Sequence, residues 1–122
     1  MTKRELIDLC LTMPNVYEDY PFDENAAVIR HKDNKKMFAL IGICNKSKEG
    51  RLFVNLKCEP NEADFLRNIY TDVIPGWHMN KKHWNTVYVD GDVPFEELQR
   101  MIGHAYDLIR ASQKAKRKTK SK

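Results

Sequence analysis

What the sequence lacks excludes several classes of protein. No apolar run approaches the roughly 20 residues of a membrane span, and Asp8 interrupts the apolar positions of the first residues, which argues against a secretory signal. The three cysteines, Cys10, Cys44 and Cys58, contain no CxxC pair, which argues against a disulfide framework or a zinc knuckle. We therefore expect a cytoplasmic protein with no membrane segment and with three buried, reduced thiols.

The residue patterns of common catalytic sites are also scarce. The five glycines are scattered and form no phosphate-cradling loop, and Ser47 and Ser112 lie in polar surroundings rather than on a nucleophile turn. His78 and His83 lack a third ligand at a supporting spacing. Paired carboxylates lie where solvation or a helix dipole explains them, at Glu18-Asp19, Asp23-Glu24 and Glu96-Glu97. We expect no enzymatic activity, no metal and no cofactor.

Positive charge is present but unevenly distributed. The formal net charge is +4, and residues 114–122, KAKRKTKSK, hold six basic residues and no acid, so the remainder of the chain carries a charge of −2. Within that remainder, residues 30–57 hold eight basic residues against two acids, whereas residues 1–29 hold two against six. Basic character is thus concentrated in one central segment and one tail.

Periodicity divides the chain into helices and strands. A capping box, Thr2 to Glu5, opens a helix with apolar residues at helical spacing, and Pro60 is placed in the first turn of a second helix. Asp92 and Pro94 open a third. Alternating or apolar runs predict strands, with residues 17–22 as a connection. The expected helices are 3–13, 60–70 and one from about residue 94, and the expected strands are 26–31, 36–44, 51–57, 77–80 and 83–90.

These elements predict an α+β fold of two layers. An antiparallel sheet of about five strands carries helices on one face, in the order helix, three strands, helix, two strands, helix. We expect one domain over residues 1–113. Residues 114–122 have no apolar side chain larger than alanine, which predicts a basic tail that is disordered when free.

The last two predicted strands form a hairpin within the sequence PGWHMNKKHWN. Pro75-Gly76 suits the central positions of a type II turn. If Lys81-Lys82 is a two-residue turn, Met79 faces Trp84 on one side of the sheet, and His78 faces Asn85 on the other. Trp84 is then either a core residue or a stacking platform on an open face. We mark Trp77, His78, Trp84 and Asn85 as candidate stacking or pocket residues.

The predicted turns are basic, which is a pattern of nucleic-acid binding. The candidate phosphate contacts are Lys35, Lys36, Lys46, Lys48, Lys81, Lys82 and His83. Neighbouring turns of a meander alternate between the two ends of a sheet, so the alternative is that these lysines form no single patch and only keep the turns soluble.

Several motifs together resemble the MmcQ/YjbR family. They are PGWHMNKKHWNTV, Tyr20-Pro21-Phe22, Lys36-Met37-Phe38-Ala39, Leu56-Lys57-Cys58-Glu59-Pro60 and Ala105-Tyr106-Asp107-Leu108. The resemblance covers nearly all of residues 1–110 and implies the element order given above, an architecture similar to type III secretion chaperones and a double-wing DNA-binding protein. It implies no catalytic residue. Trp77 stands where this family often has tyrosine, and the lysine-rich tail is not part of the family pattern.

Two hypotheses of function follow from the sequence. The first is a non-enzymatic DNA-binding protein that contacts the phosphate backbone through basic turns and the tail. The second is a protein-interaction or chaperone-like module that pairs an exposed apolar face with another polypeptide or with a second copy of the chain. A small-molecule pocket near Trp77 and His78 is a third possibility.

Overall fold

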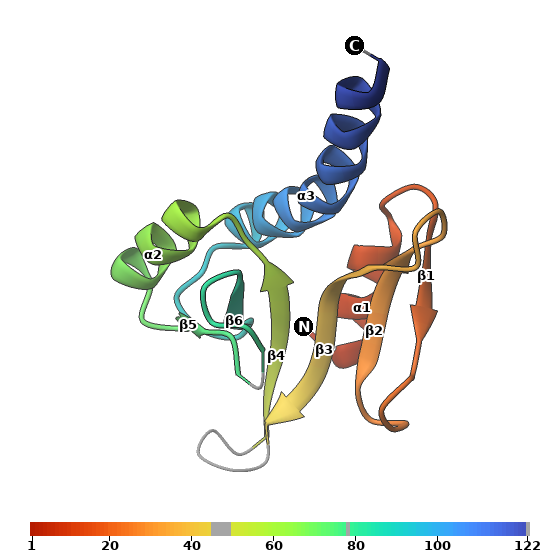
Figure 1. Ribbon diagram of the computed structural model, residues 1–122. Helices are drawn as coiled ribbons and strands as arrows, with labels where there is room; N and C mark the ends of the chain where they lie inside the picture. Colours follow the sequence, from red (N-terminus) through yellow and green to blue (C-terminus); the bar gives the residue numbers. More distant parts are fainter. Residues whose placement is uncertain (45–49, 78, 122) are drawn as a thin grey trace.

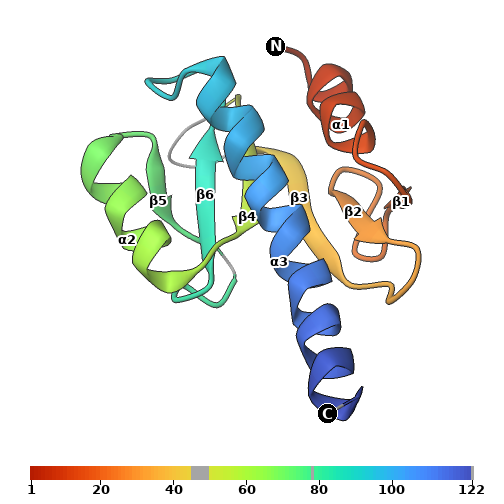
Figure 2. The ribbon, with the colours of Figure 1, turned by 90° about the horizontal axis from the view of Figure 1, so that it is seen from above.

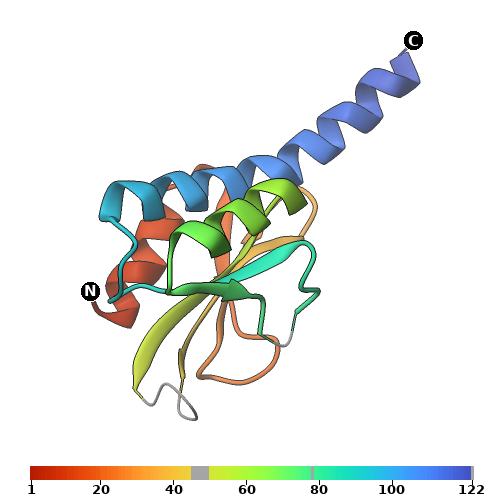
Figure 3. The same cartoon turned by 90° about the vertical axis from the view of Figure 1, so that its left-hand side faces the viewer.

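The computed structural model describes residues 1–44, 50–77 and 79–121, with side chains described as far as Arg110. Three helices lie on one face of a six-stranded antiparallel sheet, and Figure 3 shows the two layers edge-on. The sheet order is β1-β2-β3-β4-β6-β5. In chain order the elements are α1 (Lys3–Leu11), β1 (Val16–Asp19), β2 (Ala27–His31), β3 (Met37–Cys44), β4 (Arg51–Lys57), α2 (Pro60–Ile69), β5 (Val73–Pro75), β6 (Trp84–Tyr88) and α3 (Phe95–Ser121) (Figure 1). The predicted α+β architecture and its element order are confirmed.

The predicted capping box starts α1. The Thr2 hydroxyl accepts a hydrogen bond from the backbone N–H of Glu5, and the Glu5 carboxylate accepts one from the backbone N–H of Thr2. Both bonds satisfy donors that a helix start otherwise leaves without partners. The apolar side of α1 then buries Leu6, Ile7 and Cys10 against the sheet.

The sheet has one strand more than the sequence predicts. Residues 16–19, which belong mostly to the predicted connection, pair with β2 as the edge strand β1. Glu18 and Asp19 are acidic, and for this reason the sequence predicts a loop here. In the fold, Glu18 bonds Arg4 of α1, and Asp19 bonds Arg30 of β2 at 2.9 Å. Charged residues are common on edge strands because they discourage pairing with another chain.

The predicted strand 77–80 and its pairing are wrong, although Lys81 and Lys82 do lie in a turn, in which the N–H of His83 donates to the carbonyl of Asn80 at 3.2 Å. The strand before β6 is β5, which ends at Pro75, and Pro75 pairs with Asn85. Residues 76–83 are therefore a connection and not two strand ends facing each other. The predicted type II turn at Pro75-Gly76 is also absent, because Gly76 does not have the positive φ that this turn requires.

The main core lies between the sheet and the helices. It contains Phe38, Ile41 and Val54 from the central strands and Ile102 and Tyr106 from α3, all buried. A smaller cluster lies on the other face of the sheet, which we call the open face. It contains Cys44, Phe53 and Tyr88, with Leu40, Ile74 and Trp77 packed against them. All three cysteines are buried and free, as the sequence predicts.

The connections divide between two ends of the sheet. We call one the lysine end: it holds the β2–β3 turn with Lys35 and Lys36, and the turn before β6 with Lys81 and Lys82 (Figure 2). The other is the arginine end, where Arg51 begins β4. Helix α3 crosses the lysine end, and its backbone continues to Ser121 beyond the body of the fold. The predicted disorder of residues 114–122 stays a prediction.

Candidate functional site

The connection 76–83 is fixed to the open face of the sheet by a buried polar network. The backbone N–H of Trp77 donates to the Thr86 hydroxyl at 2.9 Å, and that hydroxyl donates to Oδ1 of Asn55 at 2.5 Å. Nδ2 of Asn55 then donates to the carbonyl of Trp77 at 3.2 Å. Thr86 and Asn55 are buried and directly opposite each other on β6 and β4. A satisfied polar network of this kind holds one arrangement of the backbone, so Trp77 is held in place over the sheet.

Gly76 allows the chain to approach β6 this closely. A Cβ at this position would lie 2.7 Å from Cβ of Trp84 and 2.9 Å from its carbonyl oxygen. The backbone N–H of Gly76 donates to that same carbonyl at 2.8 Å. The glycine of the Pro-Gly pair therefore serves close approach of two backbones rather than a turn with positive φ.

Arg67 of α2 fixes the other half of the connection. Its Nε donates to Oδ1 of Asn85 at 2.6 Å, and its Nη2 donates to the carbonyls of Trp84, at 3.2 Å, and of Lys81. Nδ2 of Asn85 donates back to the carbonyl of Ala63 on α2 at 3.3 Å. One guanidinium thus binds three acceptors and sets the position of the turn that carries the lysines.

Among the described side chains, the lysines of this end have no acidic partner. Lys35, Lys36, Lys81 and Lys82 are exposed, and every ion pair among the described side chains is formed by an arginine. Lys35 has a φ of 60°, which turns the chain tightly between β2 and β3. Within the described residues, Nζ of Lys81 donates only to the carbonyl of Gly76, at 3.3 Å. These ammonium groups are therefore not neutralised within the described part of the fold.

Arg51 at the other end is neutralised. It bonds Asp72 at 3.0 Å and Asp90 at 2.7 Å, and its guanidinium lies 4.6 Å from the ring centroid of Tyr88. Hydrogen bonds to the two carboxylates raise the pKa of Arg51 above its already high usual range. Arg51 adds to the positive charge counted from the sequence, but in the fold it links β4 to the loops 70–72 and 89–92.

The remaining predicted site residues are either outside the described residues or at least half-buried. Lys46, Lys48 and His78 lie outside the described residues. His83 is half-buried, and its carbonyl accepts from the N–H of Cys58 at 2.8 Å. Trp84 is buried beneath the Lys57 ammonium, which lies 5.5 Å from its ring centroid, so it is not a free stacking surface. Asn85 is also buried, bonded to α2 as described above.

Sequence reasoning missed part of the open face. A hollow of about 270 Å³ lies there, lined by Phe22, Leu40, Phe53, Asn55, Trp77 and Met79. Of these, only Trp77 was a predicted site residue. The alternation of RLFVNLK contained a signal for another, because Phe53 shares the side of its strand with Asn55 and Lys57. A large aromatic residue on a polar side of a strand indicates a second apolar surface.

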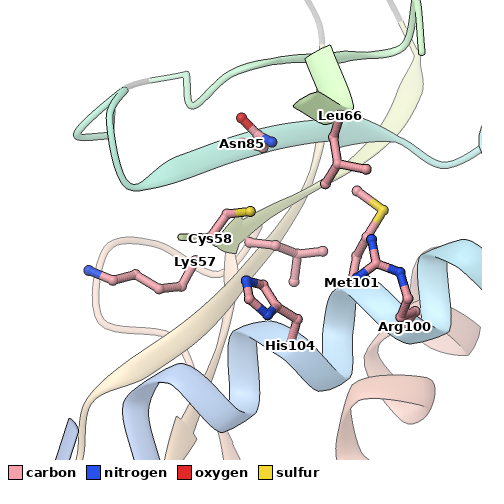
Figure 4. A pocket seen from close by; sticks show the side chains of 8 residues that line it. Lys57, Cys58, Leu66, Asn85, Arg100, Met101 and His104 are labelled. Carbon is pink, nitrogen blue, oxygen red and sulfur yellow. The ribbon is translucent and has the colours of Figure 1, made fainter. Parts of the chain in front are cut away.

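A second cavity lies between the helix layer and the sheet and contains a thiol beside a histidine. Figure 4 shows Cys58 at the end of β4 facing His104 of α3, with Leu66 and Met101 nearby. Burial raises the pKa of Cys58 to about 11, so the thiol stays protonated at neutral pH. Nε2 of His104 accepts from the N–H of Glu59 at 3.3 Å. The volume of about 10 Å³ holds one water at most, so this cavity admits no substrate.

In the described part of the chain, no helix has the length and the apolar character needed to cross a membrane. No three histidine, cysteine, aspartate or glutamate side chains come together there as a set of metal ligands.

Comparison with known proteins gives consistent relatives. The chain is 35% identical to the protein YjbR of Escherichia coli (strain K12) over 106 residues, which cover 87% of this chain and 85% of that protein. It is 34% identical to YyaQ of Bacillus subtilis (strain 168) over 100 residues, 75% of this chain and 84% of YyaQ. Both relatives are described as uncharacterized proteins.

Solved structures show the same fold. A crystal structure of a Pseudomonas syringae protein aligns with a TM-score of 0.78 and 28% identity, covering 88% of this chain and 98% of that one. A Deinococcus radiodurans protein with the domain DUF419 aligns with a TM-score of 0.75 and 33% identity, covering 88% and 78%. The family profile named YjbR matches residues 11–108. The chain therefore belongs to the YjbR family.

Proposed function

We propose that this protein binds nucleic acid through the phosphate backbone, using the lysine end of the sheet. The observation that carries the proposal is the state of the charges there. Lys35, Lys36, Lys81 and Lys82 are exposed at one end, and within the described side chains none has a carboxylate partner. Ammonium groups without a carboxylate partner bind phosphate with the largest gain in free energy, because binding releases the counterions of the nucleic acid and breaks no internal ion pair.

The path of α3 adds to this support. Contacts that hold helix α3 at the lysine end include the bond of Nε2 of His31 to the carbonyl of Tyr106 at 3.0 Å and the bond of the N–H of Glu59 to His104. From there its backbone leads residues 114–121, five of which are basic, away from the same end of the sheet. The tail and the two turns therefore act on one nucleic-acid segment rather than on opposite sides of the molecule.

The test is the salt dependence of binding to duplex DNA. The affinity of the full chain should fall as salt rises, with a logarithmic slope of about −0.9 per phosphate contacted. In the variant Lys81→Gln/Lys82→Gln the slope should become shallower by about 2. The matched control is Arg4→Gln/Arg100→Gln, which removes the same charge from two exposed arginines that are already ion-paired. Its slope should equal that of the wild type.

Two results would overturn the proposal. One is no binding of DNA at low salt. The other is an equal loss in the lysine and arginine variants, which would mean that net charge alone attracts DNA. A chain that ends at residue 113 tests the tail separately: an unchanged affinity would remove the tail from the interface and leave the turns in it.

A protein-interaction role is the second candidate, favoured by the outer face of α2. Phe65 and Ile69 lie one helical turn apart on it and are 58% and 50% exposed. Size-exclusion chromatography coupled to light scattering measures the molar mass in solution and would reveal a dimer. If Phe65→Ser converted such a dimer to a monomer and the wild type bound no DNA, this role would replace the first.

A further inference from the structure

The open face of the sheet carries an aromatic groove that the lysine turns do not explain. The rings of Phe53 and Trp77 meet nearly edge-to-face, with centroids 6.1 Å apart and planes at 78°. The hollow of about 270 Å³ lies on one side of this pair. A second hollow of about 520 Å³ shares both rings and is also lined by Lys3, Asp23, Asn25, Ala26, Gly42 and Ile43. The two hollows share this aromatic pair in their walls, and we call them together the groove.

The walls of the groove are positioned before anything binds. Trp77 is fixed through its own backbone by Asn55 and Thr86, as described above. Gly42 leaves room for the Phe53 ring, because a Cβ there would lie 3.1 Å from two atoms of that ring. Rings that are already ordered lose little conformational freedom on binding, so more of the contact energy appears as affinity.

Phe22 at the rim is not a core residue. It is 66% exposed, although the hollow beside it is apolar and includes Leu40 and Met79. A phenyl ring at this exposure contributes little to the folded core. It does provide an aromatic face next to Trp77, on a loop between β1 and β2.

The size and surroundings of the groove indicate its occupant. Its first hollow is slightly smaller than the roughly 300 Å³ at which pockets for drug-sized ligands begin, so it suits one planar ring system. Two lysines that form no ion pair with the described side chains lie on the two sides. Lys81 bonds the carbonyl of Gly76, next to Trp77, and Lys3 lines the second hollow and bonds the carbonyl of Asn25 at 2.5 Å. Aromatic rings between ammonium groups match bases linked by phosphates. The Asp23 carboxylate is occupied by the N–H groups of Asn25 and Ala26.

We propose that this groove binds an unpaired base of single-stranded nucleic acid, stacked between Phe22 and Trp77, while the lysine end holds the neighbouring phosphates. The inference rests on the proposed function and adds the form of nucleic acid that is preferred. A base within a duplex is already stacked and paired, so it cannot enter the groove without being flipped out.

The experiment compares three probes by fluorescence anisotropy at low salt: a labelled DNA single strand, the duplex of the same sequence, and a strand of equal length with abasic sites. Phe22→Ala should weaken binding of the single strand on the order of 10-fold and leave the duplex and the abasic strand unchanged. Phe22→Trp should restore the affinity. The matched control is Phe95→Ala, at a half-exposed phenyl ring at the start of α3, which should change nothing.

The outcomes separate this inference from the proposed function. Equal single-strand affinities of Phe22→Ala and Phe95→Ala, or wild-type binding of the abasic strand as tight as that of the intact strand, would overturn the groove as a base site while duplex binding through the lysines stands. Binding of no probe at all would overturn the proposed function and this inference with it.

Discussion

The two ends of the sheet use positive charge in different ways. At the arginine end, Arg51 is enclosed by Asp72, Asp90 and the Tyr88 ring and links three segments of the chain. At the lysine end, Lys81 and Lys82 have no carboxylate partner among the described residues. The difference teaches that the number of basic residues does not locate a binding surface. The presence or absence of an internal counterion does, because an ion pair must be broken before its charge can serve a ligand.

Within the lysine end as well, arginine stabilises the structure, whereas the lysines are left exposed to solvent. Arg67 builds the turn by binding backbone carbonyls, and Lys81 and Lys82 are displayed on it. Planar guanidinium groups suit several fixed acceptors at once, whereas a flexible ammonium group suits a ligand whose position varies. We therefore expect the stability of the fold to depend on the arginines and not on the lysines.

Removing Arg67 should have the largest effect on stability. Arg67→Ala leaves Asn85, which is 1% exposed, without the donor to its Oδ1 and also frees the carbonyls of Lys81 and Trp84. We expect the free energy of unfolding to fall by about 3 kcal/mol, because bonds to a charged donor are lost and a buried acceptor is left unpaired. Urea denaturation with an unchanged m-value measures this.

The control for Arg67 is Arg100→Ala. Arg100 forms ion pairs with Glu62 and Glu97 that are open to solvent, and exposed pairs contribute about 1 kcal/mol or less. If Arg67→Ala cost no more than Arg100→Ala, the lysine turn would not depend on α2 for its position.

Asp72 should have the next largest effect, at the arginine end. Its carboxylate bonds Arg51 and also accepts from the backbone N–H of Asp92 at 3.1 Å. In Asp72→Asn the side chain keeps its shape and loses its charge, so we expect a loss of about 2 kcal/mol in the free energy of unfolding. Asp64→Asn on the exposed side of α2 is the control, with no expected change. Equal denaturation midpoints for the two variants would show that the ion pair between Arg51 and Asp72 does not stabilise the fold.

The core beneath the lysine end should respond to pH through His31. Its ring lies 4.4 Å from that of Tyr106 and 5.3 Å from that of Phe38, and burial is the main cause that lowers its pKa. The hydrogen bond to the Tyr106 carbonyl opposes burial and raises this pKa, Arg110 lowers it further, and Asp33 and Asp107 have smaller raising effects. The unfolded chain therefore binds a proton more readily than the folded one, so the stability that neutral His31 contributes is present above about pH 6.5 and is lost as the pH falls below it.

Chemical denaturation at pH 7.5 and pH 5.5 measures this effect. His31→Phe keeps a ring in the same place and should flatten the dependence of the unfolding free energy on pH, whatever its effect at one pH. His83→Gln, at a half-buried histidine on the lysine turn, should keep the wild-type dependence. An unchanged slope in His31→Phe would assign the acid sensitivity to other groups.

The limits of sequence reasoning here lie at contacts between distant residues. The start of α1 was predictable because Thr2 and Glu5 satisfy each other within one turn. The strand pairing after α2 was not, since Asn55 and Thr86 are 31 positions apart and together fix the backbone of Trp77. The strand β1 was missed for the same reason, because its acids look like loop residues until their arginine partners are placed.

The candidate site was predictable in its residue types but not in its arrangement. The sequence identified Lys35, Lys36, Lys81 and Lys82 as candidates, and left open whether the turns that carry them share an end. They do, because β6 lies beside β4 and begins where β4 finishes. Phe22 was named only as part of the motif Tyr20-Pro21-Phe22, because nothing in the sequence shows that this acidic loop and Trp77 line the same hollow.

The lysines should have the smallest effect on stability, although they are central to the proposed function. None of the four at the lysine end has an ion pair among the described residues, and their exposed side chains bury little surface. Lys35→Gln/Lys36→Gln/Lys81→Gln/Lys82→Gln should change the free energy of unfolding by no more than about 0.5 kcal/mol in total. Relief of repulsion between like charges works in the stabilising direction. Thermal unfolding of the variant beside Asp72→Asn checks this. A loss as large as that of Asp72→Asn would mean that the lysines hold the fold together and are not reserved for a ligand.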